Sequence, residues 1–167
     1  MEVIAKNVWA QIAEHKEDEY KHPFLNSDNA KSRLLLECFK YHGLIVAFDF
    51  DNTIYDRHQK GYDLTEVIDL LRECSNLEGF TMVLFTVEFE ESKIEAKKKY
   101  CQELGIRVDF VNTSPIMSES RKPYYNILLD DRAGLREAYE TLNFVVSCEK
   151  ELKISKLCKK LWKNDQK

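Results

Sequence analysis

The sequence has no apolar run of about 18 residues, which is the length that a membrane-spanning helix needs. Its first residues also lack the basic stretch and apolar segment of a signal peptide, because Glu2 and Lys6 interrupt that region. We therefore expect a cytoplasmic protein without a membrane partner.

Cysteine pairs of the C-x-x-C type are absent too, and the number of cysteines is odd. The five lie at Cys38, Cys74, Cys101, Cys148 and Cys158. This pattern favours reduced thiols over a disulfide framework, with a zinc site as the lesser alternative. The net charge of −4 gives no indication of general binding to nucleic acid or to a membrane surface. The 167 residues, 44% of them hydrophobic, suffice for one domain with one buried core.

An apolar run that ends in two aspartates is the most informative segment of the chain. Residues 44–53 are Leu-Ile-Val-Ala-Phe-Asp-Phe-Asp-Asn-Thr, which predicts a strand and then a turn at Asp49 and Asp51. Two carboxylates ~4 Å apart repel by roughly 4 kcal/mol at an effective dielectric constant of ~20. Such repulsion favours protonation or a bound cation, and a divalent metal is the simplest partner. The alternative is an ordinary turn in which Asp and Asn serve only as turn formers.

Three later segments also predict strands that lead to chemically active side chains. Residues 80–86 end in Thr86, residues 107–111 lead through a polar loop to Lys122, and residues 125–131 end in Asp130 and Asp131. In open α/β sheets, ligands bind at the carboxyl ends of the strands. These groups are therefore expected to converge in space although they are far apart in the sequence.

The order of these groups resembles the four motifs of the haloacid dehalogenase (HAD) superfamily of phosphotransferases. Motif I, Asp-x-Asp-x-Thr, is matched by Asp49, Asp51 and Thr53; motif II by Thr86; motif III by Lys122; and motif IV by Asp130 and Asp131. The resemblance covers roughly residues 44–147. It implies a three-layer α/β/α Rossmann-like fold of the HAD type with a mainly parallel sheet. The gaps 53–80 and 86–122 are too short for a separate cap domain.

The resemblance also implies a role for each motif residue. Asp49 is expected to attack the phosphorus and form an aspartyl-phosphate, while Asp51 acts first as acid and then as base. Thr86 and Lys122 are expected to hold the oxygens of the transferred group. Asn52 and Thr53 are further candidates for substrate binding.

A magnesium site follows from the same resemblance, because Mg²⁺ prefers hard oxygen ligands. The candidate ligands belong to four residues: Asp49, Asp51, Asp130 and Asp131. The main-chain carbonyl of this set is that of Phe50 or Asp51, more often the latter. Of the acidic pair, the resemblance favours direct contact by Asp131.

Helices are expected between the strands, which is the alternation typical of a parallel sheet. The apolar spacing predicts helices over 64–77 and 90–104, and the run Lys97-Lys98-Lys99 in the second is expected to be a solvated face. A short helix over 135–142 and a final strand over 143–147 complete the expected core.

The two ends of the chain are expected to be helical and to belong to a single domain. Residues 1–43 predict two helices packed on the core, the second with N-cap candidates Ser27, Asp28 and Asn29 and an end at Gly43. The alternative is that this segment overhangs the site. Residues 44–148 form the expected HAD-like catalytic core, and residues 149–167 a lysine-rich helix.

The function that these patterns favour is that of a magnesium-dependent phosphomonoester hydrolase. The Leu-Leu-Asp-Asp-Arg stretch is similar to that of small nucleotidases, so the expected substrate is a small phosphorylated molecule, with nucleotides first. The alternatives are a phosphatase of polynucleotide ends, steered by the lysine-rich helix, a phosphatase of phosphoproteins, and a non-catalytic module that binds phosphate or metal.

Overall fold

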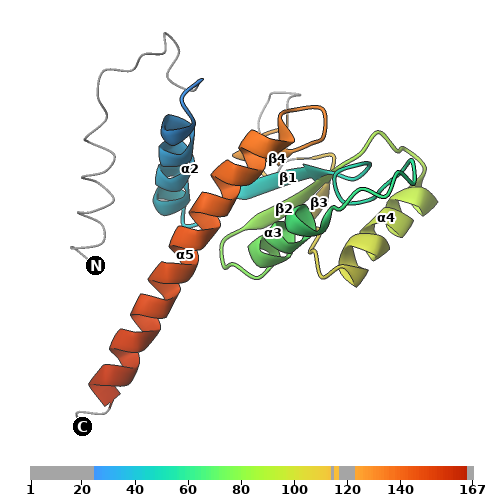
Figure 1. The fold of residues 1–167 in the computed structure, drawn as a ribbon. Helices are drawn as coiled ribbons and strands as arrows, with labels where there is room; N and C mark the ends of the chain where they lie inside the picture. Colours follow the sequence, from blue (N-terminus) through green and yellow to red (C-terminus); the bar gives the residue numbers. More distant parts are fainter. Residues whose placement is uncertain (1–24, 114, 117–122, 165–167) are drawn as a thin grey trace.

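The structure is a computed structural model that describes residues 25–113, 115–116 and 123–164 (Figure 1). Residues 154–164 are described by their backbone alone. The first predicted helix of the N-terminal segment and the predicted motif III residue Lys122 lie outside the described residues. No helix in the described part of the chain is both long and apolar enough to cross a membrane.

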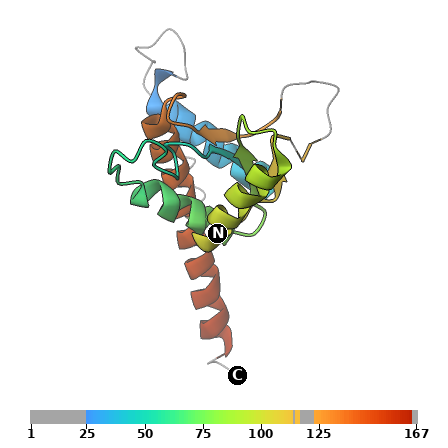
Figure 2. The same cartoon turned by 90° about the vertical axis from the view of Figure 1, so that its right-hand side faces the viewer.

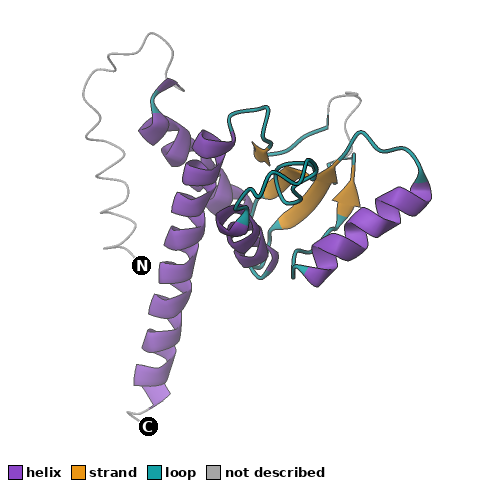
Figure 3. Ribbon diagram, turned by 45° about the vertical axis from the view of Figure 1, so that its right-hand side comes forward, coloured by secondary structure: helices purple, strands orange, loops and turns teal. Residues whose placement is uncertain are grey.

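Four parallel strands form one sheet, which is flanked by helices (Figure 3). The strands are β1 (Ile45–Asp49), β2 (Thr81–Phe85), β3 (Phe110–Val111) and β4 (Ile127–Leu129), in the order β3-β2-β1-β4. Parallel neighbours require crossover connections. Helix α3 (Thr65–Ser75) connects β1 to β2, and α4 (Glu91–Glu103) connects β2 to β3. The predicted Rossmann-like α/β class is confirmed.

The central strand is buried on both of its faces, as expected for a parallel sheet covered on both sides. Val46, Ala47 and Phe48 of β1 are each 0% exposed. Successive side chains of a strand point to opposite faces, so Val46 and Phe48 share one face and Ala47 lies on the other. Val46 and Phe48 belong to the hydrophobic cluster that also contains Leu71 of α3 and Cys101 of α4.

Helix α2 (Ser27–Tyr41) is the second helix expected for the N-terminal segment. Its N-cap is Asn26, whose side chain accepts a hydrogen bond from the Asp28 N–H at 2.8 Å, so the helix begins slightly earlier than the expected caps. It ends at His42, which has a left-handed φ of 58°. Leu34, Leu35 and Cys38 bury one side of the helix in the core, and α2 packs against helix α5.

The prediction of a final strand over 143–147 is wrong, because helix α5 runs without interruption from Leu135 to Asn164. Val145 and Val146 are fully buried and follow the equally buried Leu142 at the spacing of one helical face. Packing against α2, α3 and β4 thus outweighs the strand preference of β-branched residues. No glycine or proline lies between 135 and 164 to end the helix.

The predicted boundary at 148 therefore falls inside α5, whose later turns extend beyond the other described elements (Figures 1 and 2). Of the lysines expected on the C-terminal helix, Lys150 forms an ion pair with Glu73 of α3 at 2.8 Å. This ion pair links α5 to the last turns of α3.

The four cysteines whose side chains are described are free. Burial raises the pKa of Cys38 and Cys101 to about 12, and it raises the pKa of Cys74 as well. These thiols therefore act as small apolar side chains of the core.

Two glycines allow the loops before β1 and β2 to touch. A Cβ atom on Gly43 would collide with the main chain of Gly79, and one on Gly79 would collide with the carbonyl oxygen of His42. Gly79 also has a φ of +81°, in the left-handed region. The contact sets β1 and β2 in register at their first residues, where the Thr81 N–H donates to the Leu44 carbonyl at 2.8 Å.

We expect Gly79→Ala to destabilise the protein by clearly more than Gly61→Ala. Gly61 has a φ of +75° but no atom within 4 Å of the new Cβ, so its substitution isolates the cost of left-handed backbone. That cost is about 1 kcal/mol, and the collision at Gly79 adds to it. Urea unfolding of both variants measures the difference, and equal losses would show that the two loops do not touch.

Candidate active site

The candidate site lies at the carboxyl ends of the strands, where the pairing register places Asp49 next to its neighbours. Asp49 of β1 pairs with Phe85 of β2, and Phe48 pairs with Leu129 of β4, so Asp130 follows beside Asp49. The chain moves from β1 to β2 and β3 on one side and returns to β4 on the other. Such a reversal of strand order is where open α/β sheets bind ligands.

A cavity of about 260 Å³ opens at this edge of the sheet. It is lined by Asp49, Phe85, Thr86, Val87, Asn112, Pro123 and Asp130. Asp49, Thr86 and Asp130, expected from the sequence to converge, are thus brought together. Lys122 lies outside the described residues, although its neighbour Pro123 is part of the lining.

The turn after β1 is built by main-chain hydrogen bonds. The N–H groups of Ile54 and Tyr55 both donate to the Phe50 carbonyl at 3.1 Å, and the Asn52 N–H donates to the Tyr55 carbonyl at 2.7 Å. Asn52 adopts a left-handed φ of 61°, which Asn tolerates better than most residues. The strand therefore ends at Asp49, and the turn carries Asp51 away from the strand axis, as the sequence predicts.

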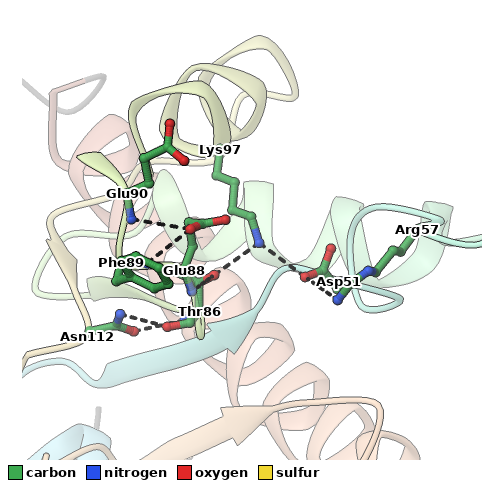
Figure 4. Close-up of polar contacts among 8 residues, drawn as sticks. All are labelled: Asp51, Arg57, Thr86, Glu88, Phe89, Glu90, Lys97 and Asn112. Atoms are coloured by element: carbon green, nitrogen blue, oxygen red, sulfur yellow. Dashed lines mark hydrogen bonds and ion pairs between the residues drawn. The ribbon is translucent and has the colours of Figure 1, made fainter. Parts of the chain in front are cut away.

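Asp51 and Thr86 are joined by Lys97 of helix α4 (Figure 4). The Lys97 Nζ lies 3.1 Å from Asp51 Oδ2 and 3.0 Å from Thr86 Oγ1. It also lies 4.5 Å from the centre of the Phe50 ring. The same Asp51 oxygen is 3.5 Å from the guanidinium of Arg57, whose side chain is 58% exposed.

The expectation that Lys97 belongs to a solvated face is therefore wrong, since its side chain is only 15% exposed. Lys98 and Lys99 do lie on the outer face, where each pairs with a glutamate of the same helix. A signal in the sequence marks the difference: Lys97 occupies an inward position on the helical stripe Ile94, Lys97, Cys101 and Leu104.

Thr86 is held from β3 by Asn112, a residue that sequence reasoning missed. The Asn112 side chain accepts from the Thr86 N–H at 2.8 Å and donates to the Thr86 carbonyl at 2.7 Å. Asn112 has a left-handed φ of 52° and follows β3 directly. An asparagine at the end of a strand is a weak sequence signal, because Asn is also a common turn residue.

Thr53 connects the turn after β1 to the loop after β4. Its side chain is fully buried, and its Oγ1 accepts from the Asp131 N–H at 3.2 Å. The structure therefore shows Thr53 in a contact between two loops, and its predicted contact with substrate stays a prediction. Asn52, the other predicted substrate-binding residue, has a buried Oδ1 with no hydrogen-bond partner among the described residues.

The acidic pair after β4 is divided between two environments. Asp130 is half-buried, lines the cavity, and accepts a hydrogen bond from the Arg132 N–H at 2.8 Å. Asp131 is exposed. The position of Asp130 makes it the better placed of the two for direct contact with a metal in the cavity, and the predicted direct contact by Asp131 stays a prediction.

Burial, together with the nearby carboxylates of Asp130, Asp51 and Asp131, raises the pKa of Asp49 to about 6, although a hydrogen bond from the Phe50 N–H acts in the opposite direction. Asp49 is thus half-buried in a negative field set up by the neighbouring carboxylates. Such a field favours a bound cation.

The donor set of the cavity fits magnesium. Within the described ranges, no three His, Cys, Asp or Glu side chains come close enough together to enclose a metal ion. Mg²⁺ is usually held by only one or two carboxylates, with waters and substrate phosphate completing its shell. Asp49 and Asp130, side by side on the cavity wall, supply carboxylates of that kind.

Comparisons with known proteins identify no family for this chain. No protein-family model matches the chain, and no curated protein matches it. Among solved structures, the chain is similar to a conserved protein from Bacteroides thetaiotaomicron, with 24% sequence identity over 54% of this chain and 77% of that one and a TM-score of 0.45. A likeness of that size supports no conclusion about function.

We expect Thr53→Val to lower the free energy of unfolding by about 1–3 kcal/mol, because it leaves the Asp131 N–H without its acceptor. Thr53→Ser keeps the hydroxyl and is the matched control. Urea unfolding measures both variants. If valine is tolerated better than serine, the hydroxyl does not join the two loops.

Proposed function

We propose that this protein is a magnesium-dependent phosphomonoester hydrolase that acts through an aspartyl-phosphate at Asp49. One observation carries the proposal: Asp49 at the end of β1, Thr86 directly after β2 and Asp130 directly after β4 line one cavity. Lys97 also joins Asp51 to Thr86. The activity is the one that the resemblance to the HAD superfamily implies.

In the first step a carboxylate oxygen of Asp49 attacks the phosphorus, and the bond between phosphorus and the leaving oxygen breaks. Asp51 gives its proton to that oxygen. In the second step water attacks the phosphorus of the aspartyl-phosphate, Asp51 takes a proton from the water, and the Asp49 carboxylate leaves. Two easier displacements replace one difficult one.

Thr86 is prepared to bind an oxygen of the transferred group. Its Oγ1 already accepts hydrogen bonds from Lys97 Nζ and from the Glu88 N–H. A hydroxyl has two acceptor positions and one proton, so the proton of Thr86 is left to donate. A phosphoryl oxygen in the cavity is a suitable acceptor.

Magnesium would be held by the carboxylates of Asp49 and Asp130 and by the main-chain carbonyl of Asp51. When bound, it supplies positive charge that offsets the negative charge of the phosphoryl group. The crowding of carboxylates around Asp49 supports this assignment.

Nucleotide monophosphates are the proposed substrate class. The cavity of about 260 Å³ is smaller than the usual pocket for a drug-sized ligand, so a nucleotide would place only its phosphate end inside. Val87, on the cavity wall, is 91% exposed, and Phe89 in the same loop is 93% exposed. This loop offers apolar surface for a nucleobase.

We expect Asp49→Asn to lower phosphate release by about 10³-fold or more, because the amide is a poor nucleophile. Its stability should equal or exceed that of the wild type, since the substitution removes a desolvated negative charge. Asp69→Asn, on the outer face of α3, is the matched control and should keep full activity.

Phosphate release is measured from nucleotide, sugar and polynucleotide-end monoesters, with Mg²⁺ and with EDTA. Release that requires Mg²⁺ and is lost only in Asp49→Asn supports the proposal. Full release by a folded Asp49→Asn variant would contradict the role of Asp49. The absence of release by the wild type from any ester would contradict the proposed activity and favour a phosphate-binding module instead.

A further inference from the structure

Lys97 forms its ion pair with a residue outside α4, unlike the neighbouring lysines Lys98 and Lys99. Lys98 pairs with Glu95 and Lys99 with Glu103, each three or four residues away on the same helix. At those distances from Lys97 the chain has Lys93, Ile94, Tyr100 and Cys101, so the helix offers it no acid. Its ion pair reaches Asp51 instead, 46 residues away in the sequence.

The two polar partners of Lys97, Asp51 and Thr86, belong to the proposed site. Withdrawing an ammonium group from water is costly unless it is paired and hydrogen-bonded. That cost is offset here by contacts of the ammonium with Asp51, the Thr86 hydroxyl and the Phe50 ring. Arg57, the other described cation on Asp51, is more exposed and farther away, so it contributes less.

We propose that Lys97 is a positioning residue, which holds the acid Asp51 at a fixed place beside the phosphate-binding hydroxyl of Thr86. The inference rests on the proposed function. Asp51 sits on a turn after β1 and Thr86 on the loop after β2, and the ammonium of Lys97 bridges their side chains at 3.1 and 3.0 Å. A proton delivered by Asp51 reaches the leaving oxygen only if this geometry is kept.

The ammonium also changes the charge of the site. Asp49, Asp51, Asp130 and Asp131 bring four carboxyl groups to the region in which a phosphate must bind. Lys97 places a positive charge among them, and binding of inorganic phosphate should depend on it.

The test compares Lys97→Met with Lys98→Met. Methionine keeps most of the length of the lysine stem and removes its charge, and Lys98 is the adjacent lysine on the outer face. An alkyl leaving group needs a proton from Asp51, whereas a nitrophenyl group leaves without one. For Lys97→Met we expect kcat to fall by about 10²-fold on an alkyl phosphate and by less than about tenfold on nitrophenyl phosphate.

Lys97→Arg, which restores the charge, should recover part of the alkyl rate, and Lys98→Met should resemble the wild type on both esters. If kcat of Lys97→Met falls equally on the two esters, the inference is overturned, whereas the proposed hydrolase function is not. Inorganic phosphate binding, followed by calorimetry with Mg²⁺ present, gives a readout without turnover. We expect at least a tenfold loss of affinity in Lys97→Met alone.

If the wild type hydrolyses no ester, the proposed function fails, and the binding measurement decides on Lys97. A loss of phosphate affinity in Lys97→Met alone would then support a role for this lysine in binding an anion. Equal affinities in both variants would overturn its role.

Discussion

The parallel pairing of β1 with both of its neighbours is the constraint on which the site depends. It aligns Asp49 with Phe85 on one side and Phe48 with Leu129 on the other, so that Asp130 follows beside Asp49. Residues at the ends of separate strands therefore line one cavity. A slip by one residue would turn every side chain of β1 to the opposite face. Such a slip would place the large side chains of Val46 and Phe48 where the small Ala47 now fits. Both faces are closely packed, so this exchange is unfavourable.

The charge of the site is balanced by residues from distant parts of the chain. The carboxyl groups at the ends of β1 and β4 repel one another, and the raised pKa of Asp49 reports that repulsion together with burial. Lys97 from α4 and Arg57 from the loop after β1 offset part of it at Asp51. The remaining negative field around Asp49 and Asp130 is what a magnesium ion would neutralise. The fold thus keeps mutually repelling carboxyl groups close together, which is typical of functional sites.

The strands and the convergence of their ends could be predicted from the sequence because buried parallel strands are nearly continuous apolar runs, and charges at their ends stand out. Lys97 was missed because a run of three lysines is normally solvated, and only the helix face distinguishes the first from the other two. Residues 143–147, which were expected to form a strand, are helical because α5 packs on α2 and α3 and buries Val145 and Val146 there. Asn112 was missed because its bonds to Thr86 join residues that are 26 positions apart.

The most direct test of the central claim is chemical trapping of the intermediate. The protein is mixed with Mg²⁺ and an intact ester that it hydrolyses, and borohydride is added at once. The protein is then digested, and its peptides are sequenced by mass spectrometry. Borohydride reduces an aspartyl-phosphate to homoserine, so the account predicts homoserine at position 49 and at no other aspartate. Homoserine at position 51 or 130, or release of phosphate without any reduced aspartate, would contradict it.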